Sequence, residues 1–117
     1  MFGKGKKDEG LDTSVTYHVR MLPEEGGQKV EFSLRGSALV GTGENCDVCL
    51  PVPGRDKGIG SFLVRNGNVF YCAKKSKTKS FVEGTEAVPD VEMVLMSGCD
   101  LTFGSVTYFV TWQIGGV

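Results

Sequence analysis

The sequence has no apolar run of about 18 residues, which is the length that a membrane-spanning helix needs. Its first ten residues, MFGKGKKDEG, are polar and lack the apolar core of an export signal. Without such a signal, we expect the four cysteines to be reduced thiols and not a disulfide framework. The sequence therefore predicts a cytoplasmic protein with no membrane span.

The chain also has little net charge, because 13 lysines and arginines are set against 14 acidic residues. A net charge of −1 gives no global field that attracts DNA or an anionic membrane, so any binding charge must be local. One local cluster exists, since four lysines lie between residues 74 and 79. We interpret it as a solvated loop, which short lysine runs usually are, and keep nucleic-acid binding as the weaker alternative.

Signatures of catalysis are missing as well. His18 is the only histidine and no GxSxG elbow accompanies it, so a Ser-His-Asp hydrolase is not expected. The glycine turn at residues 41–43 leads into another apolar–polar segment and not into a phosphate-binding helix. The segment GRDKGIG lacks the Gly-Lys-Ser/Thr ending of a P-loop. The sequence therefore predicts neither an enzyme nor a cofactor.

Cys46 and Cys49 form the one pair with metal-like CxxC spacing. A structural zinc site needs four converging ligands, and a second such pair is absent. The segment CDVCLP has the pattern of a strand, on which Cys46 and Cys49 would point to opposite faces. We expect structural thiols and no metal, and a metal or redox site stays open as the less favoured alternative.

The chain does contain a strong period-two alternation, the pattern of a strand with one face on a core. The last of these runs is apolar on parts of both faces, which predicts a strand inside the structure or at a contact. The inward positions of the three clearest runs are Val15, Tyr17, Val19 and Met21; Val30, Phe32 and Leu34; and Val106, Tyr108, Val110 and Trp112.

Seventeen glycines and several turn signals separate the runs at intervals of roughly 8–12 residues. Asn66-Gly67, between SFLV and VFYC, predicts a tight type I′ hairpin. No window carries a helical apolar stripe, so we predict an all-β chain, most simply a two-sheet sandwich. We expect one domain over residues 14–113, after a flexible lead-in at 1–13 and before a tail at 114–117. The chain could equally be one domain of a larger multidomain protein or complex.

Four segments, in the right order between Val30 and Trp112, resemble the forkhead-associated (FHA) domain. The resemblance implies an FHA-like β-sandwich of about eleven mostly antiparallel strands in two sheets. In its usual form this family binds phosphothreonine peptides and is not catalytic. The segments are SALVGTGENCDVCLP, SFLVRNGNVFYC, SKTKSFVEG and LMSGCDLTFG.

The sequence departs from the family at the residues that read the phosphate. The arginine that ends the family's third strand and pairs the phosphate is Thr42 here. For the next loop we favour the register that keeps Phe62 and Val64 facing the core. That register puts Gly58 at the phosphate-binding serine and Ser61 at the structural histidine. The chain therefore resembles a degenerate member of the family.

The following loop is also altered. The asparagine that holds the bound peptide corresponds to Thr78, whereas Ser76 keeps the family pattern. The end of SKTKSFVEG, residues 81–84, matches the hairpin of the scaffold. Cys99 replaces the aspartate after the glycine of the fourth segment.

Four cations are candidates to replace the missing arginine as an anion site, because the resemblance implies that their loops meet at one apex. They are Arg55, Lys57, Lys77 and Lys79. We favour a phosphorylation-independent or altered interaction module that acts as a scaffold in a larger assembly or signalling protein. The alternative is a phosphothreonine reader that uses these cations. The expected partner is a protein or peptide, phosphorylated or acidic in the second case.

Overall fold

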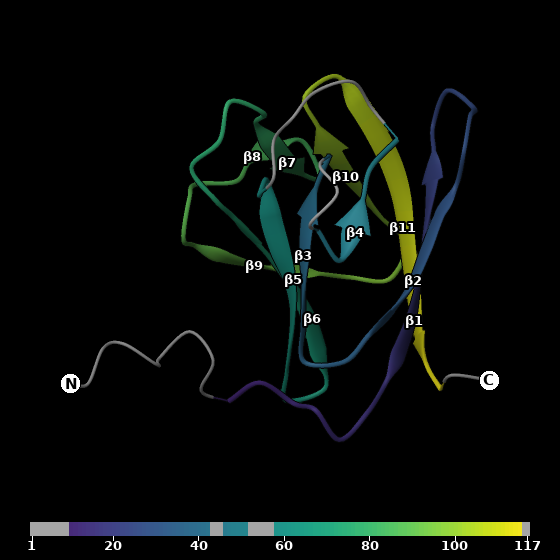
Figure 1. The fold of residues 1–117 in the computed structure, drawn as a ribbon, viewed down its shortest axis with the longest axis vertical. Coiled ribbons are helices and arrows are strands. Elements are labelled where there is room, and N and C mark those ends of the chain that lie inside the picture. Colours follow the sequence, from purple (N-terminus) through teal and green to yellow (C-terminus); the bar gives the residue numbers. More distant parts are fainter. Residues whose placement is uncertain (1–9, 43–45, 52–57, 116–117) are drawn as a thin grey trace.

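The structure of the protein is a computed structural model that describes residues 10–42, 46–51 and 58–115. Eleven strands form two packed sheets, and the described residues contain no helix (Figure 1). This confirms the prediction of an all-β, FHA-like sandwich. In chain order the strands are β1 (Tyr17–Pro23), β2 (Val30–Leu34), β3 (Ser37–Gly41), β4 (Val48–Cys49), β5 (Gly60–Arg65), β6 (Asn68–Ala73), β7 (Ser80–Val82), β8 (Thr85–Glu86), β9 (Glu92–Leu95), β10 (Cys99–Phe103) and β11 (Val106–Ile114).

The six-stranded sheet has the order β2-β1-β11-β10-β7-β8, and the five-stranded sheet has the order β4-β3-β5-β6-β9. Every pair is antiparallel except β3 and β4, which run in parallel. β11 lies in the middle of its sheet, between β1 and β10, but its outer face is not covered, since Phe109 is 44% exposed. No helix of the described residues is long and apolar enough to cross a membrane.

The inward faces of the two sheets meet in one core. A row of aromatic rings crosses it, from Phe62 and Tyr71 in one sheet to Phe103 and Tyr108 in the other. Successive ring centroids are 5.7, 5.9 and 6.1 Å apart in edge-on arrangements, the geometry that aromatic pairs prefer. The interdigitated rings join the sheets because each strand contributes alternate side chains to the interior.

The turn and register predictions hold at three places. Asn66 and Gly67 have φ of 50° and 78°, the two positive values that a type I′ turn requires. Phe62 and Val64 are fully buried, as the favoured register demanded. The segment at residues 81–84 forms the β7–β8 hairpin.

The strand predicted at CDVCLP is shorter than expected, since only Val48–Cys49 pairs with β3. One reason is that the Asp47 carboxylate accepts a hydrogen bond from the Leu39 N–H at 2.8 Å, in place of a backbone partner. Cys46 is half-buried and Cys49 is exposed, and the Cys49 thiol donates to the Cys46 carbonyl at 3.4 Å. The four cysteines, all of them described, form no disulfide, and the described residues contain no cluster suited to a metal ion.

Candidate functional site

One end of the sandwich gathers the loops to which the sequence assigns binding. β3 ends there at Gly41, β6 ends there at Ala73, and the β10–β11 turn lies at the same end (Figure 1). Residues 10–16 and the carboxyl end of β11 lie at the opposite end (Figure 1). We call the first end the apex. Among the described residues, its main loop is the β6–β7 connection at residues 74–79, drawn in green-teal.

Hydrogen bonds tether the β6–β7 connection at its start, middle and end. The Lys74 N–H donates to the Ile59 carbonyl at 2.9 Å, which ties the start of the loop to the residue before β5. The Thr78 N–H donates to the Ser76 hydroxyl at 3.0 Å, a local turn that serines favour. The Gly104 N–H donates to the Lys79 carbonyl at 2.8 Å. The loop is therefore held in one conformation.

A hollow of about 360 Å³ lies at this loop. It opens between the β6–β7 connection and the start of the β8–β9 connection. Three lysines line it against one glutamate, so its local charge is positive. We call it the apical hollow, and its lining residues are Ala73, Lys74, Lys75, Ser76, Thr78, Lys79, Ser80, Glu86, Ala87 and Pro89.

An ion pair lies on the rim of the apical hollow. The Lys79 ammonium is 3.4 Å from a Glu86 carboxylate oxygen, and both side chains are more than half exposed. An exposed pair of this kind contributes little to stability, so an acidic ligand can compete for Lys79 at small cost. Lys74 and Lys75 are exposed neighbours on the same side of the loop.

The structure brings some of the predicted site residues together and sets others apart. Ser76, Thr78 and Lys79 line the apical hollow, whereas Lys77 is exposed on the same loop outside its lining. Gly58 lies beside Lys74, because a Cβ on Gly58 would be 3.4 Å from the Lys74 Cδ.

Two further predicted residues lie elsewhere, and two are not described. Thr42 follows β3 directly and is half-buried. Ser61 lies on the outer face of the five-stranded sheet, where it lines a separate shallow pocket with Ser37 and Lys74. Arg55 and Lys57 lie outside the described residues.

A buried polar pair beneath the apex was not anticipated from the sequence. The Tyr71 hydroxyl and the Ser80 hydroxyl are 2.6 Å apart, and Tyr71 also donates weakly to the Ile59 carbonyl at 3.4 Å. Burial raises the pKa of Tyr71 to about 12, partly offset by the Ser80 hydrogen bond. The available signal was an inward tyrosine in the run VFYC, since a buried tyrosine hydroxyl needs a partner.

Gly60 makes room for this pair. A Cβ on Gly60 would collide with the Tyr71 hydroxyl and ring. The absence of a side chain at Gly60 therefore permits Tyr71 to reach Ser80 at the first residue of β7. The pair fixes the positions at which the loops before β5 and after β6 leave the sandwich.

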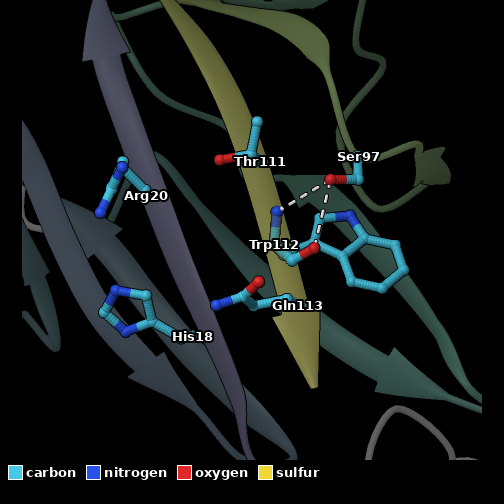
Figure 2. A pocket seen from close by; sticks show the side chains of 6 residues that line it. All are labelled: His18, Arg20, Ser97, Thr111, Trp112 and Gln113. Carbon is cyan, nitrogen blue, oxygen red and sulfur yellow. Dashed lines mark hydrogen bonds between the residues drawn. The ribbon is translucent and has the colours of Figure 1, made fainter. Parts of the chain in front are cut away.

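A second pocket lies on the outer face of the six-stranded sheet (Figure 2). His18 and Arg20 extend over β1 and face Thr111 and Gln113 on β11, while Ser97 approaches Trp112 from the side (Figure 2). The Trp112 N–H and carbonyl are both bonded to the Ser97 hydroxyl, at 3.1 and 3.2 Å. The pocket encloses about 190 Å³, and none of the predicted site residues lines it.

The cations near this second pocket already share a carboxylate. Glu31 accepts a hydrogen bond from the Arg20 Nε at 2.8 Å and lies 3.7 Å from the Lys29 ammonium. The hydrogen bond from Arg20 lowers the pKa of Glu31, and the charge of Lys29 acts in the same direction. The His18 Nε2 is 3.8 Å from the same carboxylate. The apical hollow, with its excess of lysines, is the better candidate site.

Comparisons with known proteins agree on the fold. No family model matches the sequence, and no curated protein matches it significantly. Among solved structures, the FHA domain of yeast Dun1, bound to a doubly phosphorylated peptide derived from Rad53, superposes with a TM-score of 0.68 at 21% identity. That match covers 88% of this chain and 78% of the other.

Two further structures are similar. The amino-terminal FHA domain of Rad53 from S. cerevisiae, in complex with a phosphothreonine peptide, has a TM-score of 0.70 at 14% identity, over 82% of this chain and 94% of that one. The FHA domain of CT664 from Chlamydia trachomatis has a TM-score of 0.67 at 17% identity, over 82% and 96%. In fold, the chain is an FHA-like β-sandwich.

Proposed function

We propose that the chain is a non-catalytic protein-interaction module that binds a protein or peptide partner at its apex with little or no dependence on phosphothreonine. The fold supports an interaction role, because the similar Dun1 and Rad53 domains are described in complexes with phosphorylated peptides. The tethered β6–β7 connection supports the apex as the contact, since a preformed loop loses little entropy on binding.

The observation that carries the proposal is Thr42. It follows β3 where the resemblance puts the phosphate-binding arginine, and it is a neutral, half-buried side chain. A hydrogen bond to a charged group contributes about 1.5–3 kcal/mol. Its loss lowers affinity about tenfold to over a hundredfold, so a phosphothreonine peptide of ordinary affinity would bind poorly.

A specific observation also favours the alternative, an altered phosphopeptide reader. Lys74, Lys75 and Lys79 line the apical hollow and give it a positive charge. Such a hollow suits an acidic or phosphorylated side chain, although lysine is a point charge without the bidentate fork of arginine. Lys77, Arg55 and Lys57 would belong to the same reader if their loops meet there.

The test is affinity capture from a lysate of the source cells, half of it treated with phosphatase. Wild type is compared with Lys75→Glu/Lys79→Glu, which reverses two charges of the apical hollow. The control is Lys29→Glu, an exposed lysine in the β1–β2 connection that does not line the apical hollow. We expect the same partner from both lysates, retained by the control and lost with the apical variant. A partner captured only from the untreated lysate would favour the altered reader and overturn the proposal.

A further inference from the structure

Two valines are exposed at the turn that connects β8 to β9. Val88 is 58% exposed and Val91 is 50% exposed, although valine side chains are among those most often buried. The Val91 N–H donates to the Val88 carbonyl at 3.1 Å, which closes a four-residue turn around Pro89 and Asp90. The Cα atoms of the first and last residues of such a turn are less than about 7 Å apart. The two valines therefore form an exposed apolar pair.

The local sequence fixes the shape of this turn. Asp90 has a φ of 69°, the positive value that the second central residue of a type II turn takes. Pro89 supplies the first central position, which proline favours in such turns. The pair of valines is therefore presented by a defined turn and not by an irregular loop.

Two backbone hydrogen bonds anchor the turn to the strands beside the apical hollow. The Ala87 N–H, just before the turn, donates to the carbonyl of Ser80 at the start of β7 at 2.8 Å. The Asp90 N–H donates to the carbonyl of Ala73 at the end of β6 at 2.9 Å. A surface that is held in place before binding loses little entropy when a partner binds.

The turn forms part of the rim of the apical hollow. Ala87 and Pro89 line the hollow, and Val88 lies between them in the chain. Asp90 lines the separate pocket on the outer face of the five-stranded sheet and not the hollow. The apex thus places an apolar pair beside a positively charged hollow.

Glu86 shows which anion the hollow accommodates. Its carboxylate lies 3.4 Å from the Lys79 ammonium, and Glu86 lines the hollow together with Lys74, Lys75 and Lys79. One carboxylate against three ammonium groups leaves the lining positively charged. A lysine ammonium acts as a point charge, so it holds a carboxylate without the planar fork of arginine. The lining is therefore complementary to a further carboxylate.

We propose that the apex binds an extended, unphosphorylated segment of a partner protein that carries an aspartate or glutamate and, close to it in sequence, an aliphatic side chain. The partner's carboxylate enters the apical hollow and pairs with Lys75 and Lys79, in competition with Glu86. The aliphatic side chain packs on Val88 and Val91. This inference rests on the proposed function and names the chemistry of the partner.

A protein segment fits this surface better than an anionic membrane does. The lysines line a concave hollow between two connections, and concave sites of this kind bind small groups. A single carboxylate side chain can enter such a hollow, whereas the headgroups of a flat bilayer meet mainly the rim. Peripheral membrane proteins usually insert one continuous amphipathic face instead.

The test is selection by the immobilised chain from random libraries of short unphosphorylated peptides. One library has aspartate fixed at its centre, and the other has asparagine there. We expect the wild-type chain to retain the aspartate library more strongly and to enrich an aliphatic residue at one position near the aspartate. Retention of neither library, or equal retention of both, would overturn the inference.

Variants of each contact separate the charged half from the apolar half. The affinity of the best selected peptide is measured for Val88→Ser/Val91→Ser, for Lys75→Glu/Lys79→Glu and for the matched control Val94→Ser, an exposed valine on β9 that does not line the hollow. The valine variant should bind about tenfold more weakly and lose the aliphatic preference but keep the preference for aspartate. The lysine variant should lose the preference for aspartate. Unchanged affinity in the valine variant, or an equal loss in the control, would overturn the apolar contact.

Glu86→Gln should have the opposite effect, which misfolding does not explain. Removing the competing carboxylate leaves Lys79 to the peptide and should raise the affinity of aspartate peptides about two- to fivefold, the range for an exposed ion pair. Unchanged or weaker binding would overturn the position of the partner's carboxylate.

Failure of this inference and failure of the proposed function give different results in the lysate capture. A partner lost with Lys75→Glu/Lys79→Glu but kept with Val88→Ser/Val91→Ser would leave the apex as the contact and overturn the inference. A partner kept by both variants would overturn both. Binding to vesicles of phosphatidylserine and phosphatidylcholine that is lost with both variants would overturn the choice of a protein segment as the ligand.

Discussion

The Tyr71 hydroxyl lies 2.6 Å from the Ser80 hydroxyl in the core of the sandwich, directly below the apex. The same tyrosine reaches the Ile59 carbonyl at 3.4 Å, so one side chain connects the entry of β5, the middle of β6 and the first residue of β7. These are the points at which the apical loops begin and end. The geometry of the apex therefore depends on a polar contact in an otherwise apolar core.

Removing one hydroxyl of the Tyr71–Ser80 pair should destabilise the fold. Tyr71→Phe leaves the Ser80 hydroxyl buried without its partner, and Ser80→Ala does the same to Tyr71, so each change should lower the free energy of unfolding by about 1–3 kcal/mol. Urea unfolding of both variants and of the double variant measures the coupling. The double variant should lose less than the sum of the two single losses. Additive losses would show that the two hydroxyls do not stabilise each other.

The buried tyrosine also predicts instability at alkaline pH. Burial raises the pKa of Tyr71 from 10.0 to about 12, so between these values the unfolded chain loses the proton and the folded chain keeps it. This part of the stability is present below pH 10 and is lost as the pH rises toward 12. At 1.36 kcal/mol for each pKa unit, the loss is on the order of 2–3 kcal/mol.

Because of Cys99, the free energy of unfolding should start to fall at a lower pH than Tyr71 alone would cause. Burial, with the nearby charges of Glu83 and Asp100, raises the pKa of its thiol from 9.0 to about 11. Urea midpoints measured between pH 8 and 12 should fall from about pH 9 onward. In Tyr71→Phe the part of the decline above pH 10 should be smaller. A wild-type midpoint that stays constant to pH 12 would contradict the burial of both groups.

Two glycines at the apex give a matched comparison. Gly60→Ala places a Cβ against the Tyr71 hydroxyl and should destabilise the fold by about 1–3 kcal/mol, the range for overpacking. Gly58→Ala meets only the Lys74 Cδ at 3.4 Å and the Leu39 Cδ1 at 3.7 Å, and should change stability by less than about 0.5 kcal/mol. Thermal unfolding distinguishes them, and equal effects would mean that Tyr71 does not occupy the space beside Gly60.

The ion pair between Arg65 on β5 and Glu92 on β9 should contribute less to stability than the Tyr71–Ser80 pair does. The side chains of Arg65 and Glu92 are 17% and 32% exposed, so solvent screens their attraction. A double-mutant cycle with Arg65→Gln and Glu92→Gln should give a coupling of about 0.5–1 kcal/mol. The coupling should shrink in 1 M salt, where exposed charges are screened. A coupling that is unchanged by salt would show that the pair is held by packing and not by charge.

The parts of the fold that follow from local pattern could be predicted. Asn66-Gly67 required a type I′ turn, and the alternation around Tyr108 and Val110 required a strand with one buried face. Pairing between distant residues could not be read in this way. Tyr71 and Ser80 are nine positions apart and meet only because β6 and β7 belong to different sheets.

The candidate site could be predicted only in part. The lysines of the β6–β7 connection stood out as a cluster in the sequence. The other side of their hollow is formed by Glu86 at the end of β8 and by Ala87 and Pro89 after it, a segment in which the sequence showed no binding pattern. Ser61 lies on an outer sheet face because strand alternation sends it away from the core while Phe62 points inward. Arg55 and Lys57 remain predictions, since they lie outside the described residues.

The central claim is that the apex binds its partner with little dependence on phosphothreonine. The most direct measurement is a comparison of dissociation constants for threonine peptides from the captured partner, each in phosphorylated and unphosphorylated form. Because Thr42 supplies no charge to the phosphate, the account predicts that the two forms differ by less than about tenfold, or 1.4 kcal/mol. A phosphorylated form that binds more than about a hundredfold tighter, and loses this preference in Lys75→Glu/Lys79→Glu, would contradict the account.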